Sequence, residues 1–150
     1  MHTDAARAAP RLFHRMPSAL LLLLLVSAGA MAGRSAATPA LKPGDLPPVD
    51  VGTTMTGDRV RLDSQTGVVT VVSFWAGWCA PCRQEMSLLD QIQAQVGADQ
   101  LRVIAVNIED RATFRRIHRQ LKDSIHFTLS NDPRGVVARK YGVNAIPHSV

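Results

Sequence analysis

The chain contains two cysteines, Cys79 and Cys82, within the run Trp-Ala-Gly-Trp-Cys-Ala-Pro-Cys at residues 75–82. We expect a strand ending at Trp75 to deliver Cys79 to the first turn of a helix, where free backbone N–H groups and the positive end of the helix dipole stabilise an anion. Because the thiolate is the form that attacks a disulfide, this position makes Cys79 the nucleophile and Cys82, one turn further on, the resolving thiol. The spacing therefore predicts a redox dithiol.

The same cysteine pair has other conceivable uses. A zinc site takes about four ligands, and His118, His126 and His148 show no paired ligand spacing beside the motif. A structural disulfide across so small a loop restrains the unfolded chain less than the ~2–4 kcal/mol typical of longer loops. We therefore predict no metal and no cofactor, and we keep Cu(I) binding by two soft thiolates as the alternative function.

The first 32 residues have the order of a secretory signal peptide. Arginines precede Pro17, an apolar run covers residues 19–26, and small residues follow, with cleavage expected after Ala30 or Ala32. The apolar run is shorter than the ~20 residues that span a bilayer, but an extension over residues 19–32 would make it an uncleaved signal anchor. Both alternatives place the dithiol in the periplasm or another extracytoplasmic compartment, where cysteine pairs are driven to the disulfide. A dithiol that works there needs a reducing partner.

Composition and charge indicate one domain behind this leader. Residues 33–48 are expected to form a linker and residues 49–150 the domain. The formal net charge of +5 falls to +3 without the leader, with 14 Lys and Arg against 11 Asp and Glu, which is no nucleic-acid signature. Basic residues recur at helical spacing and predict one solvated face, with docking to an acidic partner as the alternative. They are Arg111, Arg115, Arg119 and Lys122, with Arg116 beside them.

Hydrophobic periodicity predicts strands that alternate with helices, and hence a mostly parallel α/β sheet. A hairpin is expected over residues 51–62, with residues 59–62 as its second arm, and β-branched runs predict inner strands at 68–75 and 101–108. Helices are expected from Pro81 to a stop at Gly97, over 113–122, and from a cap at Asp132 to Gly142. The apolar stripe of the first helix consists of Met86, Leu89, Ile92 and Val96.

Three segments together resemble the exported thioredoxin-like proteins of the TlpA/ResA type, in the AhpC/TSA- and redoxin-like branch of the thioredoxin superfamily. They are the motif at 74–86, the strand at 103–108, and Tyr-Gly-Val at 141–143 ahead of Ile146-Pro147. The resemblance covers residues 45–150 and implies a thioredoxin fold with thiol–disulfide exchange, Cys79 attacking and Cys82 resolving. It also implies a cis Ile146–Pro147 bond facing the dithiol, where a substrate peptide pairs as an added strand. The implied substrate contacts are Trp78, Ala80, Pro81, Ile146 and Pro147.

The resemblance also implies partners. They are protein disulfides such as apocytochrome c cysteine pairs in cytochrome c biogenesis, or a copper-site assembly protein, with a membrane thiol reductase as electron donor. The family topology adds a C-terminal hairpin and helix that follow His148-Ser149-Val150. Since both are missing here, we expect the strand at 68–75 to lie at a bare edge and this length of chain to fold poorly. A non-catalytic truncated fragment is therefore a third interpretation.

The chain departs from the pattern of the proteins that it resembles at two positions near the dithiol. Thioredoxins proper have a buried carboxylate where this chain has Ser73, and some reductases of this branch have an acidic residue where it has Ala80. These differences leave the proton acceptor for Cys82 open. We expect Glu85 to interact with the positive end of its helix rather than to transfer protons.

The remaining candidates are interpreted as structural. Glu109 and Asp110 are expected to stabilise a loop or cap a helix, and His148 to be a strand residue rather than a proton carrier. Trp75 is predicted to lie in the core. Trp78 is predicted to flank the active surface.

Overall fold

The computed structural model describes residues 41–62 and 67–150, so the expected leader at 1–32 and residues 33–40 of the expected linker lie outside the described residues. The described strands are β1 Asp50–Thr53, β2 Arg59–Arg61, β3 Val69–Trp75, β4 Leu101–Asn107, β5 Thr128–Asn131 and β6 His148–Ser149. The described helices are α1 Ala80–Val96, α2 Arg111–Leu121 and α3 Val136–Lys140. No helix in this part of the chain is long and apolar enough to cross a membrane.

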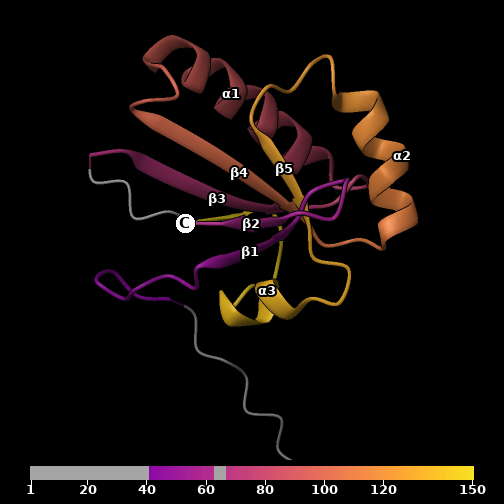
Figure 1. Ribbon diagram of the computed structural model, residues 1–150, viewed down its shortest axis with the longest axis horizontal. Helices are drawn as coiled ribbons and strands as arrows, with labels where there is room; N and C mark the ends of the chain where they lie inside the picture. The colour runs from indigo at the N-terminus through magenta and orange to yellow at the C-terminus, as the bar shows by residue number, and fades with distance from the viewer. Residues whose placement is uncertain (1–40, 63–66) are drawn as a thin grey trace, which may run out of the picture. The chain divides into compact units, whose positions relative to one another are not determined.

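The strands form one mixed sheet in the order β2-β1-β5-β4-β3-β6 (Figure 1). β3, β4 and β5 are parallel neighbours, whereas β1 runs antiparallel to both β2 and β5, and β6 runs antiparallel to β3. The predicted hairpin is confirmed, because the short turn between β1 and β2 makes them antiparallel neighbours. The expectation of a mostly parallel sheet is wrong, since antiparallel strands flank the parallel centre on both sides.

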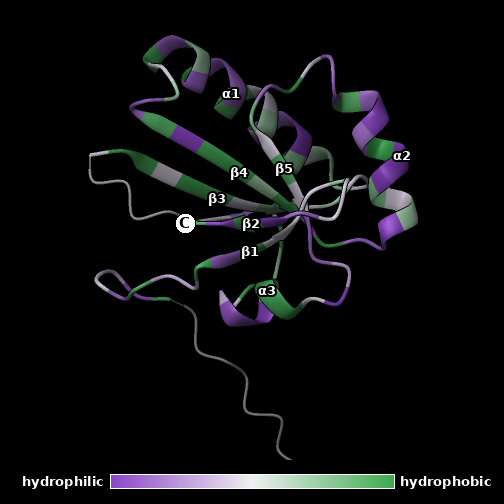
Figure 2. Cartoon of the chain, in the orientation of Figure 1, coloured by the Kyte–Doolittle hydropathy of each residue, from purple (hydrophilic) through white to green (hydrophobic). Residues whose placement is uncertain are grey.

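The sheet separates two apolar layers. Along β4, Val103 and Ala105 pack in the cluster that contains α1 and α2 side chains, whereas Ile104 and Val106 pack in the cluster that contains Val137 of α3. This alternation follows from the two-residue period of a strand. In Figure 1, α1 and α2 accordingly lie on one side of the sheet and α3 on the other, and Figure 2 shows β3 and β4 as mainly hydrophobic. These two covered strands carry the loops of the site described below.

Helix α1 starts and stops as predicted, but its apolar side chains are buried over a shorter stretch of the helix than predicted. It begins after the N-cap Cys79 and ends at Gly97, whose φ of 93° favours glycine and whose N–H donates to Gln93 O. Met86 is buried, whereas Ile92 and Val96 are 36% and 41% exposed, so the expected apolar stripe is wrong in its second half. There the helix meets β4 through a polar contact instead, because Gln93 Oε1 accepts a hydrogen bond from Val103 N at 2.8 Å.

Helix α3 begins later than predicted. Its N-cap residue is Gly135 and not the predicted Asp132, although the two carboxylate oxygens of Asp132 accept hydrogen bonds from Val136 N and Ala138 N, both at 2.9 Å. Gly135 has a φ of 63°, and this left-handed residue prevents a helix from running continuously from Pro133. The helical residues therefore start at Val136.

The segment at residues 41–48 contains no helix or strand, but it contacts the domain. Tyr141 Oη donates a hydrogen bond to Pro48 O at 2.8 Å, and Leu41 packs against the same cluster as Tyr141. The second half of the expected linker is thus held at the domain's apolar layer by contacts at both of its ends.

Candidate active site

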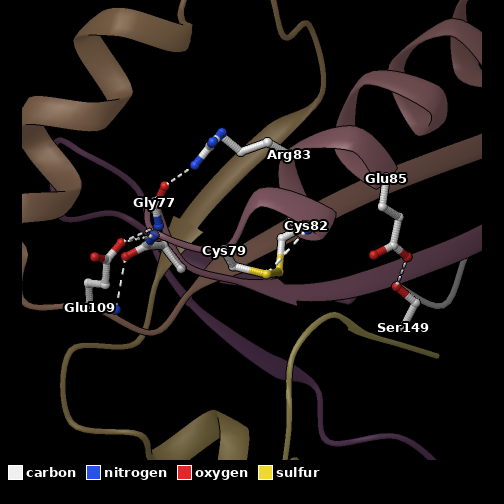
Figure 3. The surroundings of a disulfide bond; sticks show 8 residues. Gly77, Cys79, Cys82, Arg83, Glu85, Glu109 and Ser149 are labelled. Carbon is white, nitrogen blue, oxygen red and sulfur yellow. Dashed lines mark hydrogen bonds between the residues drawn. A yellow bond between two sulfur atoms is a disulfide. The ribbon is translucent and has the colours of Figure 1, made fainter.

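Cys79 and Cys82 are joined by a disulfide at the start of α1 (Figure 3), with an S–S distance of 2.04 Å and a Cα–Cα distance of 5.3 Å. Cys79 Sγ also accepts a hydrogen bond from Cys82 N at 3.2 Å, as expected for an N-cap residue. Cys79 is 4% exposed and Cys82 is fully buried. Solvent and partners therefore reach the pair through Cys79, which suits it to be the attacking sulfur.

The loop between β3 and α1 is held at Gly77. Gly77 N donates a hydrogen bond to Glu109 Oε2 at 2.6 Å, and Gly77 O accepts one from the Arg83 guanidinium (Figure 3). Asn107 Nδ2 donates to the same Glu109 oxygen at 3.1 Å. The predicted loop role of Glu109 is confirmed, and Asp110 caps α2 through the N–H groups of residues 112 and 113.

Glycine at position 77 also allows this loop to pack closely against a side chain of α2. A Cβ atom there would overlap Cδ1 of Ile117 and lie 3.2 Å from Glu109 Oε2. The loop before the cysteines consequently packs directly on α2. The contact between Gly77 and Glu109 could not be found from sequence spacing, because Glu109 lies 32 residues further along the chain.

A groove of about 550 Å³ lies beside the disulfide loop, between Trp78 and Ile146. Its other lining residues are Ile108, which follows β4, and residues of α3 and its flanking segments: Gly135, Ala138, Arg139, Val143, Asn144 and Ala145. The Ile146–Pro147 peptide bond is cis, as the resemblance implied. The structure thus brings Trp78 and Ile146 together in one groove, whereas Ala80, Pro81 and Pro147 are exposed but do not line it.

Polar side chains from three elements meet on the other side of the cysteines. Glu85 Oε1 accepts a hydrogen bond from Ser149 Oγ at 2.5 Å (Figure 3), and Ser149 pairs with Ser73 across β6 and β3. Ser73 Oγ and Glu85 Oε2 are buried without a hydrogen-bond partner in the described part of the chain. Glu85 lies beyond the first turn of α1, so it bonds to β6 rather than serving the helix end as expected. Sequence reasoning missed Ser149, because only the β3–β6 pairing places it here.

The chain is similar to known proteins in sequence and in fold. The model of the AhpC/TSA family matches residues 43–150. The chain belongs to the AhpC/TSA family. Thioredoxin-like protein YneN from Bacillus subtilis is 33% identical over 92 residues, which are 61% of this chain and 51% of YneN. The chain thus spans about half the length of that relative.

Two further proteins are similar to this chain. Thiol-disulfide oxidoreductase ResA from Geobacillus kaustophilus is 26% identical over 135 residues, or 88% of this chain and 76% of ResA. The crystal structure of a protein from Chlorobium tepidum, described as a thiol:disulfide interchange protein DsbE, has a TM-score of 0.62 and 38% identity, covering 73% of this chain and 77% of that one. The resemblance to the ResA type is confirmed. The fold is thioredoxin-like, and the Cys79–Cys82 site is that of a thioredoxin-like thiol–disulfide oxidoreductase.

The structure also shows the burial or packing of the other candidate residues of this AhpC/TSA-family domain. Trp75 is fully buried, as predicted, and Trp78 is 70% exposed. His148 lies in β6 with its ring edge-on to Phe74 at a centroid distance of 6.1 Å, which fits the predicted strand role. Among the described residues, no group of three or more His, Cys, Asp or Glu side chains could hold a metal ion.

The basic face of α2 is smaller than predicted. Arg111 is half-buried and donates hydrogen bonds to Thr53 Oγ1 and to the carbonyls of Thr54 and Met55, at 3.0 to 3.3 Å. It therefore ties α2 to the turn after β1. The exposed basic side chains are Arg115, Arg116, Arg119 and Lys122.

Proposed function

We propose that the protein is an extracytoplasmic thiol–disulfide oxidoreductase that reduces disulfides of protein substrates. The observation that carries this proposal is the position of Cys79: it is the N-cap of α1, it is joined to buried Cys82, and it is the only one of the two with any exposure. The leader pattern at residues 1–32 supports a location outside the cytoplasm.

The reduced pair would act by two successive exchanges. The Cys79 thiolate attacks one sulfur of the substrate disulfide, so that a mixed disulfide forms and the other substrate sulfur leaves as a thiolate. The Cys82 thiol then loses its proton and attacks Cys79 Sγ, which releases the second substrate sulfur and forms the Cys79–Cys82 disulfide. In total, two electrons pass from the dithiol to the substrate, Cys79 and Cys82 release two protons to solvent, and the two substrate thiolates take up two protons from solvent.

Local groups favour the thiolate of Cys79. Its Sγ accepts the hydrogen bond from Cys82 N and lies at the positive end of a helix of 17 residues. Ala80 adds no charge between the cysteines, so this stabilisation depends on the backbone. Glu85, three residues after Cys82 in α1, accepts a hydrogen bond from Ser149 of β6. These two side chains are our candidates for positioning the water that takes the proton of Cys82.

Substrate and donor follow from the ResA-type resemblance. Apocytochrome c cysteine pairs, or the cysteines of a copper-site assembly protein, are the proposed substrates, and a membrane thiol reductase is the proposed donor. The groove between Trp78 and Ile146 offers an extended substrate segment an apolar surface beside Cys79.

Disulfide trapping in the exporting cell tests the proposal. Cys82→Ser removes the resolving thiol, so Cys79 should retain its substrate in a covalent adduct that a reducing agent releases. The Cys79→Ser/Cys82→Ser variant is the matched control and should form no adduct. Equal adducts in both variants would reject the proposal, and a reduction potential at or above about −120 mV would show an oxidant instead of a reductant.

A further inference from the structure

A second hollow lies beside Trp78, on the side that faces α2. It measures about 400 Å³ and carries two guanidinium groups, those of Arg83 and Arg116. Its other lining residues are Gly77, Trp78, Glu109, Ile117, Gln120 and Leu121. We call it the arginine hollow. We propose that it binds an acidic segment of the protein partner whose cysteines exchange with Cys79, an inference that rests on the proposed function.

The charges around the arginine hollow favour an anion. Arg83 is held in place because it donates a hydrogen bond to Gly77 O, and Arg116 projects from the exposed face of α2. The carboxylate among the lining residues is Glu109, and its Oε2 already accepts hydrogen bonds from Gly77 N and Asn107 Nδ2. A carboxylate of a partner would therefore meet the two guanidinium groups, whose planar donors match it well.

The surface next to the hollow carries the same sign of charge. Arg115 and Arg119 are exposed on α2, Lys122 is exposed at its C-cap, and residues 111–122 include no Asp or Glu. Within the described part of the chain, the one ion pair made by these side chains is between Lys122 and Asp123, at 3.8 Å and with both groups well exposed. A row of like charges that the protein leaves largely uncompensated is a surface that attracts an acidic partner.

The position of the hollow connects this charge to the redox pair. Trp78 precedes Cys79 in sequence and borders both the arginine hollow and the apolar groove beside Ile146. A partner segment with its cysteine at Cys79 therefore has the groove on one side of Trp78 and the hollow on the other. Since an extended chain advances ~3.3 Å per residue, acidic residues within a few positions of the partner's cysteine can reach Arg116.

Charge-matched disulfide peptides and charge-reversal variants test the proposal. Two oxidised peptides share one disulfide and differ only in a flanking run of aspartates or of glutamines, and the reduced full chain is assayed with each over a range of NaCl concentrations. Arg116→Glu is the test variant. Arg61→Glu is the control, because it makes the same change in net charge at an exposed position on the edge strand β2.

We expect the wild-type chain to reduce the aspartate peptide faster at low salt and to lose that preference as salt rises. Arg116→Glu should lower the rate for the aspartate peptide about fivefold and leave the glutamine peptide unchanged, whereas Arg61→Glu should change neither. Equal rates for the two peptides, or equal losses in both variants, would overturn the proposal.

A binding measurement separates this inference from the proposed function. An aspartate peptide without cysteines is titrated into the oxidised protein, and the amide resonances of Gly77 and Ile117 are followed by NMR. If the peptide shifts these resonances and Arg116→Glu abolishes the shifts, the result supports binding at the arginine hollow. This holds even if neither disulfide peptide is reduced, because that second result would reject only the proposed reductase function. No shift in the wild-type protein overturns the hollow whatever the redox assays show.

Discussion

Gly77 N donates a hydrogen bond to Glu109 Oε2 across 2.6 Å, which joins the loop before the cysteines to the loop after β4. The two loops meet because β3 and β4 are parallel neighbours, with Trp75 opposite Asn107 at their carboxyl ends. A carboxylate that accepts from a backbone N–H makes one of the stronger hydrogen bonds available. The position of the loop that leads to Cys79 is therefore set partly by the next strand of the sheet.

Replacing Glu109 should destabilise this loop in a way that depends on the acceptor. Glu109→Ala leaves Gly77 N and Asn107 Nδ2 without that oxygen, so we expect a loss of about 1.5–3 kcal/mol in the free energy of unfolding, measured in urea. Glu109→Gln keeps an acceptor oxygen and should lose less than half as much. If both variants unfold at the wild-type midpoint, the contact does not hold the loop.

Gly77→Ala should destabilise the domain for a steric reason that a second substitution relieves. The new Cβ overlaps Cδ1 of Ile117, and such overpacking costs about 1–3 kcal/mol. Ile117→Val removes that methyl group and costs about 0.5–1.5 kcal/mol by itself. We expect the double variant to be more stable than the sum of the two losses predicts, as measured by a double-mutant cycle. Simple additivity would argue against the close packing of Gly77 on α2.

The parts of the fold that the sequence predicts are those with a local signal. The β-branched run of β3, the proline in the first turn of α1 and the caps at Gly97 and Asp110 each act within a few residues, and their elements form where expected. The mixed character of the sheet was not predictable in this way. It depends on which strands become neighbours, and the β1–β5 pairing brings together residues nearly eighty positions apart, such as Thr53 and Asn131.

In the site, too, only the features with a local sequence signal could be predicted. The Cys-x-x-Cys spacing identifies the redox pair, because both cysteines belong to one helical turn. The contacts between Gly77 and Glu109 and between Glu85 and Ser149 join residues 32 and 64 positions apart, so no spacing rule reports them. Arg111 shows the opposite error: its helical spacing fits the basic face, but the side chain turns to the carbonyls of Thr54 and Met55.

Tyr141 should make the protein less stable at alkaline pH. Burial raises the pKa of Tyr141 from 10.0 to about 12. Between these two pH values the unfolded chain has lost the phenol proton while the folded chain still holds it, so stability is full below pH ~10 and falls as pH rises toward 12. Because Tyr141 is the only tyrosine, tyrosinate absorbance reports its titration directly.

The matched control for this titration is Tyr141→Phe. It loses the hydrogen bond to Pro48 O, worth about 1 kcal/mol near neutral pH, and should remove the tyrosine's part of the alkaline loss. A native-state titration of Tyr141 near pH 10 would contradict the buried position of its hydroxyl.

Replacing each of the two tryptophans near the site by alanine should change stability to very different extents. Trp75 is fully buried, so Trp75→Ala should lower the free energy of unfolding by about 3–5 kcal/mol. Trp78 is 70% exposed, and Trp78→Ala should change stability by no more than about 0.5 kcal/mol. Because Trp78 borders both the apolar groove and the arginine hollow, its loss should slow exchange with protein disulfides more than with a small organic disulfide. Equal slowing of both substrates would mean that Trp78 acts on the sulfur chemistry and not on partner binding.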